Sequence, residues 1–216
     1  MDPVSQGILG ASLASSISEP KKLKLASFCG FVGGLAPDLD VLIKSNTDPL
    51  LSLEFHRHFT HSIFFVPVGG LIVTLFLYIF LKKKLNFKKT YFYSTVGVLT
   101  HGFLDSCTSY GTHFLWPISD ERLSWNIISI IDPIYTITLF IFILISIFNR
   151  KLLFVRLGVF FSCMYLLVGV YQYQSVKEYV KKIAYERGHK VERILLNPTI
   201  GNNILWRTVY QTSTTY

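Results

Sequence analysis

Residues 63–81 form a continuous apolar run without a charged side chain, and this run limits the folds that the chain can adopt. A helix of about 20 apolar residues crosses the hydrocarbon core of a bilayer. Four other segments approach this length: 127–148 and 152–171 carry one charge each, whereas 25–43 and 91–110 are interrupted by Gly, Pro or ionisable residues. Only 16% of the residues are charged, against about 25% in soluble domains. The sequence therefore predicts an all-α polytopic membrane protein with about five transmembrane helices.

The two ends of the chain differ from this central part. Residues 1–18 are apolar and rich in small side chains, which favours a short or re-entrant helix, and they lack the basic n-region of a cleavable signal peptide. After Tyr171 the pattern predicts an amphipathic helix ending near Gly188, and then a β-hairpin formed by "VERILL" and "ILWRTVYQT". We therefore expect a transmembrane domain at residues 1–171 and a small helix-and-hairpin tail outside the membrane at residues 172–216.

The net charge of +8 is unevenly distributed. If the chain crosses the membrane at each predicted segment, three basic clusters fall on one side: Lys21, Lys22 and Lys24; Lys82, Lys83, Lys84, Lys88 and Lys89; and Arg150 with Lys151. The short loops opposite contain only Lys44, Arg57 and Arg122, so the positive-inside rule makes the first side cytoplasmic. The tail runs against this rule, because it carries seven Lys or Arg. No basic stripe is interleaved with aromatic residues, which argues against a nucleic-acid partner.

Acidic and histidine side chains gather on the predicted external side. They come from segments far apart in the sequence: Asp38 and Asp40 in "APDLD", His56, Arg57, His58 and His61 in "HRHFTHS", His101 and Asp105 in "HGFLD", and Asp132 in "IIDP". An ionisable group at membrane depth costs at least about 2.5–3.5 kcal/mol, so its presence indicates a functional site. The basic clusters define the sidedness independently, and the two patterns agree.

The types and spacing of these residues favour a metal site. His101 and Asp105 are four residues apart, so they share one face of a helix. Pro37 favours an extended backbone before Asp38, which would let the two neighbouring carboxylates converge. Carboxylates and imidazoles suit zinc, manganese or iron, and the three cysteines show no ligand spacing. Six candidate ligands are available, enough for one or two ions: Asp38, Asp40, His56, His61, His101 and Asp105.

Some of these residues have simpler explanations. A single His-x3-Asp pair is more often a hydrogen-bonded pair than a metal site. His58 and His113 suit loop or interfacial positions, and Asp120 suits an exposed surface. Trp116 and Trp125 fit the aromatic belt of a membrane interface.

Three further polar residues also leave alternatives open. Asp132 precedes Pro133, so a role as helix N-cap is as well supported as catalysis. Thr60 and Ser62 could donate to metal-bound histidines, or could cap a helix that begins at Ile63.

Five stretches together resemble a known family: "MDPVSQGILGASLA", "GGLAPDLDVL", "HRHFTHSIF", "THGFLDSCTSYGTHFLWPIS" and "SIIDPIYT". In this order they are similar to the motifs of the membrane-bound, metal-dependent hydrolases of bacterial inner membranes, the YdjM-like group. The resemblance implies a helical hydrolase distantly related to zinc-dependent phospholipase C and the P1-type nucleases, which cleave phosphoesters with clustered metals. It implies the ligands Asp38, Asp40, His56, His61, His101 and Asp105.

One residue departs from the resemblance. Many of the similar proteins have a histidine where this chain has Gln6. A glutamine is a poorer ligand for such metals, so Gln6 would either orient a ligand or weaken one metal position. Similar proteins also continue into further strands beyond the position of Tyr216.

The leading prediction is therefore a metal-dependent hydrolase at the external face of a bacterial inner membrane. Its substrate would be a phosphoester, which could be lipid-linked, and zinc would be its preferred metal. Arg57 would hold the nonbridging oxygens, and Asp40 or Asp132 would act as the base. The alternatives are a divalent-metal transporter, which the scarcity of polar groups in the cytoplasmic half disfavours, and a non-catalytic scaffold whose tail binds a partner.

Overall fold

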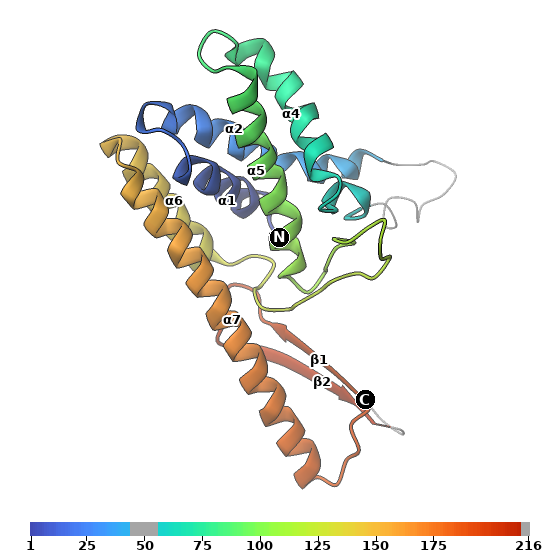
Figure 1. Cartoon of the computed structure of the whole chain (residues 1–216). Helices are drawn as coiled ribbons and strands as arrows, with labels where there is room; N and C mark the ends of the chain where they lie inside the picture. The colour runs from blue at the N-terminus through green and yellow to red at the C-terminus, as the bar shows by residue number, and fades with distance from the viewer. Residues whose placement is uncertain (44–55, 213–216) are drawn as a thin grey trace.

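The computed structural model describes residues 1–43 and 56–212, and these residues are mostly helical, as expected. The helices are α1 (Pro3–Ser16), α2 (Leu23–Leu35), α4 (Val66–Leu81), α5 (Phe87–Ser106), α6 (Pro133–Asn149) and α7 (Leu152–Glu186). Short 3-10 segments lie between them: η1 (Pro20–Lys22), η2 (Ala36–Leu42) and η3 (Phe59–His61). An antiparallel pair of strands, β1 (Arg193–Pro198) and β2 (Trp206–Gln211), follows α7. Figure 1 shows a helical bundle from which the lower half of α7 and the hairpin extend.

Helices α1, α2 and α5 form the centre of the bundle and approach one another through glycines. A Cβ atom on Gly10 would lie 2.4 Å from the carbonyl oxygen of Gly30, and a Cβ atom on Gly97 would lie 2.3 Å from the same oxygen. Only glycine fits at such distances without a shift of the backbone. Small residues allow the same close approach between helices in membranes, where apolar side chains gain little by leaving lipid. This packing fixes the end of α2 beside the C-terminal half of α5.

The outer helices α4, α6 and α7 carry apolar surface on their outward faces. Large exposed apolar side chains include Leu75, Phe76, Ile79 and Phe80 on α4, Ile137, Phe140 and Ile141 on α6, and Leu153, Phe160 and Leu167 on α7. So much contiguous apolar surface is unusual for a soluble monomer and is typical of a membrane or protein interface.

Among the described residues, two stretches are long and apolar enough to cross a membrane, residues 20–42 and α7. Two shorter apolar helices, α4 and α6, contain 16 and 17 residues. The prediction of a helical membrane protein is thus supported, whereas the number of five spans is not established by the lengths of the helices.

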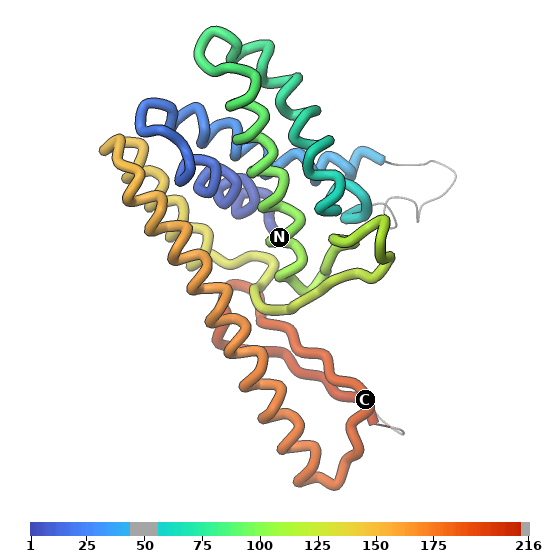
Figure 2. The backbone as a smooth tube through the Cα atoms, in the orientation of Figure 1, coloured from blue at the N-terminus to red at the C-terminus, as the bar shows by residue number. Residues whose placement is uncertain are grey.

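The three basic clusters lie together at one end of the bundle. The loops α1–α2, α4–α5 and α6–α7 all point toward the upper left in Figure 2. Lys21, Lys84 and Arg150, one from each of these loops, line a single surface pocket. The Nζ atom of Lys22 also donates to the backbone oxygen of Lys84 over 2.8 Å. The prediction that the clusters share one side is therefore confirmed by the fold.

Several predicted boundaries were wrong. The helix expected from residue 127 begins at Pro133, because Asp132 accepts a hydrogen bond from the backbone N–H of Tyr135 and caps it. Residues 127–131 are not helical, and Ile127 instead donates to the backbone oxygen of Cys107 over 2.9 Å. The helix expected from Ile63 begins at Val66, where a proline occupies the first turn.

The tail is continuous with the last apolar helix. The predicted amphipathic helix and the apolar segment before it form one helix of 35 residues, so no helix boundary lies at Tyr171. At 1.5 Å per residue this helix is about 52 Å long, well beyond the thickness of about 30 Å of a hydrocarbon core. Gly188 follows the helix with a φ of 71°.

The predicted hairpin is confirmed and packs onto the rest of the chain. The ring of Trp206 on β2 lies 6.1 Å from that of Tyr173 on α7. At its turn, Asn203 donates to the backbone oxygen of Ile127 over 3.1 Å.

Candidate metal centre

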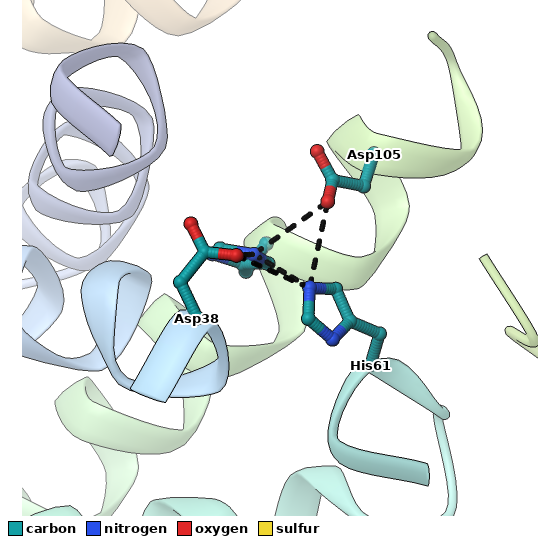
Figure 3. A group of neighbouring side chains, drawn as sticks. Asp38, His61 and Asp105 are labelled. Atoms are coloured by element: carbon teal, nitrogen blue, oxygen red, sulfur yellow. Dashed lines mark hydrogen bonds and ion pairs between the residues drawn. The ribbon is translucent and has the colours of Figure 1, made fainter. Parts of the chain in front are cut away.

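Four of the predicted ligands converge at the end of the bundle opposite the basic clusters. Asp38 lies on η2, His61 lies on η3, and His101 and Asp105 lie on successive turns of α5. Figure 3 shows Asp38, His61 and Asp105 pointing toward one another from three different elements. The extended backbone predicted before Asp38 was wrong, because Ala36 has helical angles (φ −61°, ψ −39°) and the chain continues from α2 as a 3-10 segment.

The distances between these side chains match a tetrahedral metal site. The Nε2 atom of His61 lies 3.5 Å from Asp38 Oδ1 and 3.4 Å from Asp105 Oδ2. The Nε2 atom of His101 lies 3.3 Å and 3.7 Å from the same two oxygens. The two Nε2 atoms are 2.9 Å apart. In a tetrahedral zinc site with bonds of about 2.0–2.1 Å, ligand atoms lie about 3.3 Å from one another.

Hydrogen bonds fix the ring nitrogens that face the cluster. The Nδ1 atom of His101 lies 2.6 Å from the backbone oxygen of Gly34. A carbonyl oxygen can only accept, so Nδ1 carries the proton and Nε2 presents a lone pair. Metal-bound histidines commonly donate their other N–H to such a carbonyl or to a carboxylate.

His61 is oriented in the same way by a side chain. The hydroxyl of Thr60 donates to Asp40 Oδ2 over 2.8 Å, so its only hydrogen is used. The Nδ1 atom of His61, 2.9 Å from that hydroxyl, must therefore donate to it. This chain from His61 through Thr60 to Asp40 leaves the Nε2 lone pair of His61 facing that of His101. The expected contact between Thr60 and a candidate ligand histidine is present, but its direction differs from the prediction, because Thr60 accepts from His61 and donates to Asp40.

Two facing lone pairs beside carboxylates require a cation between them. Burial alone would lower the pKa of His61, but the neighbouring carboxylates of Asp105, Asp38 and Asp40 outweigh it and raise the pKa to about 10. Asp105 Oδ2 is buried and has no hydrogen-bond partner within the described ranges. A metal ion would satisfy both histidines and this oxygen, and in the metal-free protein a proton takes over part of that role.

Asp105 is held by donors on its other oxygen. The amide of Gln6 donates to Asp105 Oδ1 over 2.8 Å, and the amino group of Met1 contacts the same oxygen. The Nε atom of Arg57 lies 3.4 Å from Oδ2. Gln6 is fully buried, and it orients a ligand through its amide. Of the two roles considered for Gln6, the geometry favours the one that leaves the metal position intact.

A second group of possible ligands, Asp38, Asp40 and His56, adjoins the first. The oxygens of Asp40 are already engaged, because Oδ1 lies 2.8 Å from His56 Nδ1 and Oδ2 accepts from the backbone of Arg57 over 2.9 Å and from Thr60. Because both oxygens of Asp40 already have hydrogen-bond partners, the second group has fewer atoms free to coordinate a metal ion than the first group.

Arg57 lies buried at the edge of the centre with a left-handed backbone, at a φ of 64°. The guanidinium carbon lies 5.0 Å from the centre of the Tyr110 ring, a cation–π contact. Its Nη1 atom is buried without a hydrogen-bond partner among residues 1–43 and 56–212. This side chain can therefore donate to an anion next to the ligands.

Asp132 takes the N-cap role that the sequence had left open, and Ser62 takes neither of the two roles considered for it. Asp132 caps α6 and accepts a hydrogen bond of 2.6 Å from Tyr165, and no contact joins it to the cluster within the described part of the chain. Its N-cap role is thus the one that the structure supports. Ser62 donates to the backbone oxygen of Trp116 and accepts from the backbone of Phe64, so it stabilises a turn and does not contact a ligand histidine.

His58 and His113 contact the centre through the backbone, because His61 donates to the backbone oxygen of His58 and His113 donates to that of Arg57, each over 3.2 Å. The ring of His58 packs at 4.7 Å against that of His113 and at 5.5 Å against Trp116. Asp120 is exposed. Two contributors were missed: the carbonyl of Gly34, which no side-chain pattern can reveal, and Tyr110, whose only signal was its place in the motif after Asp105.

Comparisons with known proteins agree with a location of this protein in a bacterial inner membrane. The chain is 27% identical over 189 residues to the uncharacterized protein YfhP of Bacillus subtilis (strain 168), a match that covers 85% of this chain and 55% of YfhP. The chain thus spans about half the length of that relative. It is 31% identical over 129 residues to the inner membrane protein YbcI of Escherichia coli (strain K12), covering 56% of this chain and 69% of YbcI. No solved structure matches.

The family model described as YdjM inner membrane protein matches residues 1–176. This range contains every residue of the candidate metal centre and all six helices of the described structure except the end of α7. The chain therefore belongs to the YdjM inner membrane protein family, as the sequence motifs indicated.

Proposed function

We propose that this chain is a membrane-embedded, metal-dependent hydrolase that acts on a phosphoester at the membrane face opposite the basic clusters. The observation that carries the proposal is the convergence of two imidazole lone pairs and two carboxylate oxygens at tetrahedral spacing, beside the unpartnered Nη1 atom of Arg57. In a buried hydrogen-bonded network without a metal, Asp105 Oδ2 would be expected to accept a hydrogen bond, and it has no such partner within the described residues.

The residues present fit one divalent ion, with zinc the best match. Asp38, His61, His101 and Asp105 would hold it, with the mixed nitrogen and oxygen ligands that zinc accepts. A bound ion of this kind supplies Lewis-acid polarisation of a phosphoryl oxygen and lowers the pKa of a coordinated water. A second ion at Asp38, Asp40 and His56 would have to displace the donors that now bind Asp40, so one ion is favoured.

Arg57 would bind the substrate phosphate. Its guanidinium is fixed by the Tyr110 ring and by the ion pair with Asp105, so little side-chain entropy is lost when an anion binds. The free Nη1 atom would donate to a nonbridging oxygen. Asp38 is the most exposed of the four ligands, with 21% of its side chain accessible, which favours entry of the phosphate from its side.

We assign the proton transfer to His56 and no longer to Asp40 or Asp132. The Nδ1 atom of His56 donates to Asp40 Oδ1 over 2.8 Å, so its Nε2 atom is the one able to take a proton. The side chain is 33% exposed and can reach a water molecule. Asp40 then orients His56 through one oxygen and, through the other, the Thr60 hydroxyl that accepts from His61, whereas Asp132 is committed to capping α6.

The proposed sidedness follows from the basic end. Because the three clusters meet at one end of the bundle, the positive-inside rule orients that end toward the cytoplasm and the metal centre toward the periplasmic or external side of the inner membrane. Membrane lipids would surround the apolar faces of α4, α6 and α7.

The test combines metal analysis with hydrolysis by the purified protein. We expect close to one zinc ion per chain and release of product from phosphomonoester or phosphodiester substrates. His101→Ala should lose the metal and the activity, whereas His58→Ala, a nearby histidine outside the centre, should keep both. His56→Gln should keep the metal and lose most of the turnover. Metal-replete protein that hydrolyses none of a broad phosphoester panel would refute the proposal.

Metal transport remains the competing function to be measured in the same preparation. Proteoliposomes that take up zinc, with uptake lost in His61→Ala, would favour the transporter. A metal-free protein in which His101→Ala changes nothing beyond stability would favour the scaffold.

A further inference from the structure

A groove of about 620 Å³ between η2 and α4 ends at Asp40 and Thr60, which adjoin the candidate metal centre. Its polar end is formed by Asp40 and Thr60, the two residues that orient His61. From there it continues past Phe65 and Gly69 toward Ile72 and Phe76. The volume lies within the range of about 300–1,000 Å³ that is typical of small-molecule sites.

The groove is apolar along its length and open on the side of the membrane-facing surface. Leu39, Ile72 and Phe76 line it and are 63%, 57% and 60% exposed. Ile72 and Phe76 belong to the outward apolar face of α4, which would face lipid in the proposed arrangement. A molecule in the bilayer could therefore enter sideways, without leaving the hydrocarbon region.

We propose that this groove holds one acyl chain of a membrane phospholipid and thereby presents the phosphate of that lipid to the metal centre. The inference rests on the proposed function in one respect, namely that the lipid held there is the substrate. It assigns the substrate class as lipid phosphoesters and gives Ile72 and Phe76 a role in selecting them.

The distribution of polar groups decides the occupant. A peptide would bring backbone N–H and C=O groups that need partners, and among the described residues of the lining only Asp40 and Thr60 have polar side chains. A soluble phosphoester would occupy only the polar end of the groove, near Asp40 and Thr60, and would leave the apolar part of the groove unfilled. An acyl chain with a polar head satisfies both parts, and acyl chains are the molecules that surround the outer face of α4 in a bilayer.

Binding can be tested without catalysis. The full-length protein in lipid nanodiscs is exposed to phosphatidic acid that carries a photoreactive diazirine near the end of one acyl chain, and the labelled peptides are identified by mass spectrometry. We expect labelling on α4 around Ile72 and Phe76. Ile72→Trp should fill the groove and remove most of this labelling, whereas Leu75→Trp, an equally exposed position on α4 outside the groove, should leave it unchanged.

Three outcomes would overturn the inference. Labelling spread evenly over the apolar surface, or labelling insensitive to Ile72→Trp, would mean that the groove holds no lipid. If a polyprenyl phosphate reduced the labelling and unlabelled phosphatidic acid did not, the occupant of the groove would be a polyprenyl chain and not an acyl chain. Retained metal content in both variants, measured in parallel, shows that the metal centre has formed.

The kinetic arm separates this inference from the proposed function. Ile72→Trp should raise the KM for a long-chain phosphatidic acid by about tenfold and leave kcat/KM for a soluble short-chain analogue unchanged. Equal effects on the two substrates would contradict the selection by the groove. If neither substrate is hydrolysed by the unmodified protein while the groove is still labelled, the proposed hydrolase fails and the lipid site stands.

Discussion

The two ends of the helical bundle hold their charges in opposite ways. At the metal centre the side chains of His61, His101 and Asp105 are completely buried and each contacts another member of the cluster. At the basic end the ion pair of Lys89 with Glu19 has 38% and 61% of its side chains exposed. The difference shows that charge can serve two purposes in one chain. Buried charges with fixed partners form a candidate site in which each group matters, whereas exposed charges act through their sum.

The physical reason is solvation. A buried ionisable group that loses a partner cannot replace it with water, so one substitution has a large effect. An exposed group is hydrated and screened, and single surface pairs contribute little. Orientation by the positive-inside rule depends on the number of basic residues near the ends of the helices, so no single lysine decides it.

The largest effect is expected from Asp105→Asn, which keeps the shape of the side chain and removes its charge. The Oδ2 atom that faces both histidines would lose most of its affinity for a cation, and zinc affinity should fall by more than about 100-fold, beyond the usual effect of an outer hydrogen-bond partner. Competition with a calibrated chelator measures it. Lys83→Gln at the basic end is the matched control and should not alter zinc affinity. Equal losses in the two variants would erase the contrast between the ends.

This contrast was partly visible in the sequence. The i, i+4 spacing of His101 and Asp105 fixes their common face on any helix, and the uncharged runs fix the helical class. Asp38 and His61 could be proposed as ligands, but the three-dimensional approach that unites them depends on glycine contacts such as Gly10 with Gly30, which no pattern of polar residues encodes. The start of α6 at Pro133 and the N-cap role of Asp132 depend on local sequence alone, because Asp132 directly precedes Pro133.

Thr60→Val tests a contact that only the structure could assign. The variant keeps the volume of the side chain and removes the hydroxyl that accepts from His61 Nδ1 and donates to Asp40. We expect zinc affinity to fall by about 10–100-fold, since the orientation of His61 would be lost. Thr60→Ser retains the hydroxyl and should stay close to the unmodified protein. A Thr60→Val protein with unchanged affinity would mean that His61 is held by packing alone.

The pH dependence of metal binding should be steep. The pKa of His61 in the metal-free protein is raised to about 10, so His61 is protonated at neutral pH and must release its proton when a metal binds. Zinc affinity should therefore increase with pH, by about tenfold per unit between about pH 6 and 8 for one released proton. Titration calorimetry in buffers of different ionisation enthalpy counts the protons. An affinity that is flat over this range would indicate a neutral His61.

The same proton should stabilise the metal-free fold. The folded pKa lies above the ordinary value of about 6.5, so the stabilisation is complete below that pH and disappears as the pH rises toward 10. Thermal unfolding of metal-free protein in detergent should show the Tm falling over this window. Added zinc should reverse the trend, because it replaces the proton.

The smallest effect is expected at the basic end itself. The Nζ atom of Lys89 lies 2.5 Å from Glu19, and this pair raises the pKa of Lys89 and lowers that of Glu19. Both groups are in contact with solvent, so Lys89→Ala should leave the Tm and the zinc content unchanged within error. The short distance alone would suggest a strong interaction. The Lys89–Glu19 pair is exposed, however, whereas the equally polar contacts around His61 are buried. If Lys89→Ala lowered the zinc affinity as much as Thr60→Val is expected to, solvation would not be the property that distinguishes the two ends, and the lysine clusters would have to be treated as part of the folded core.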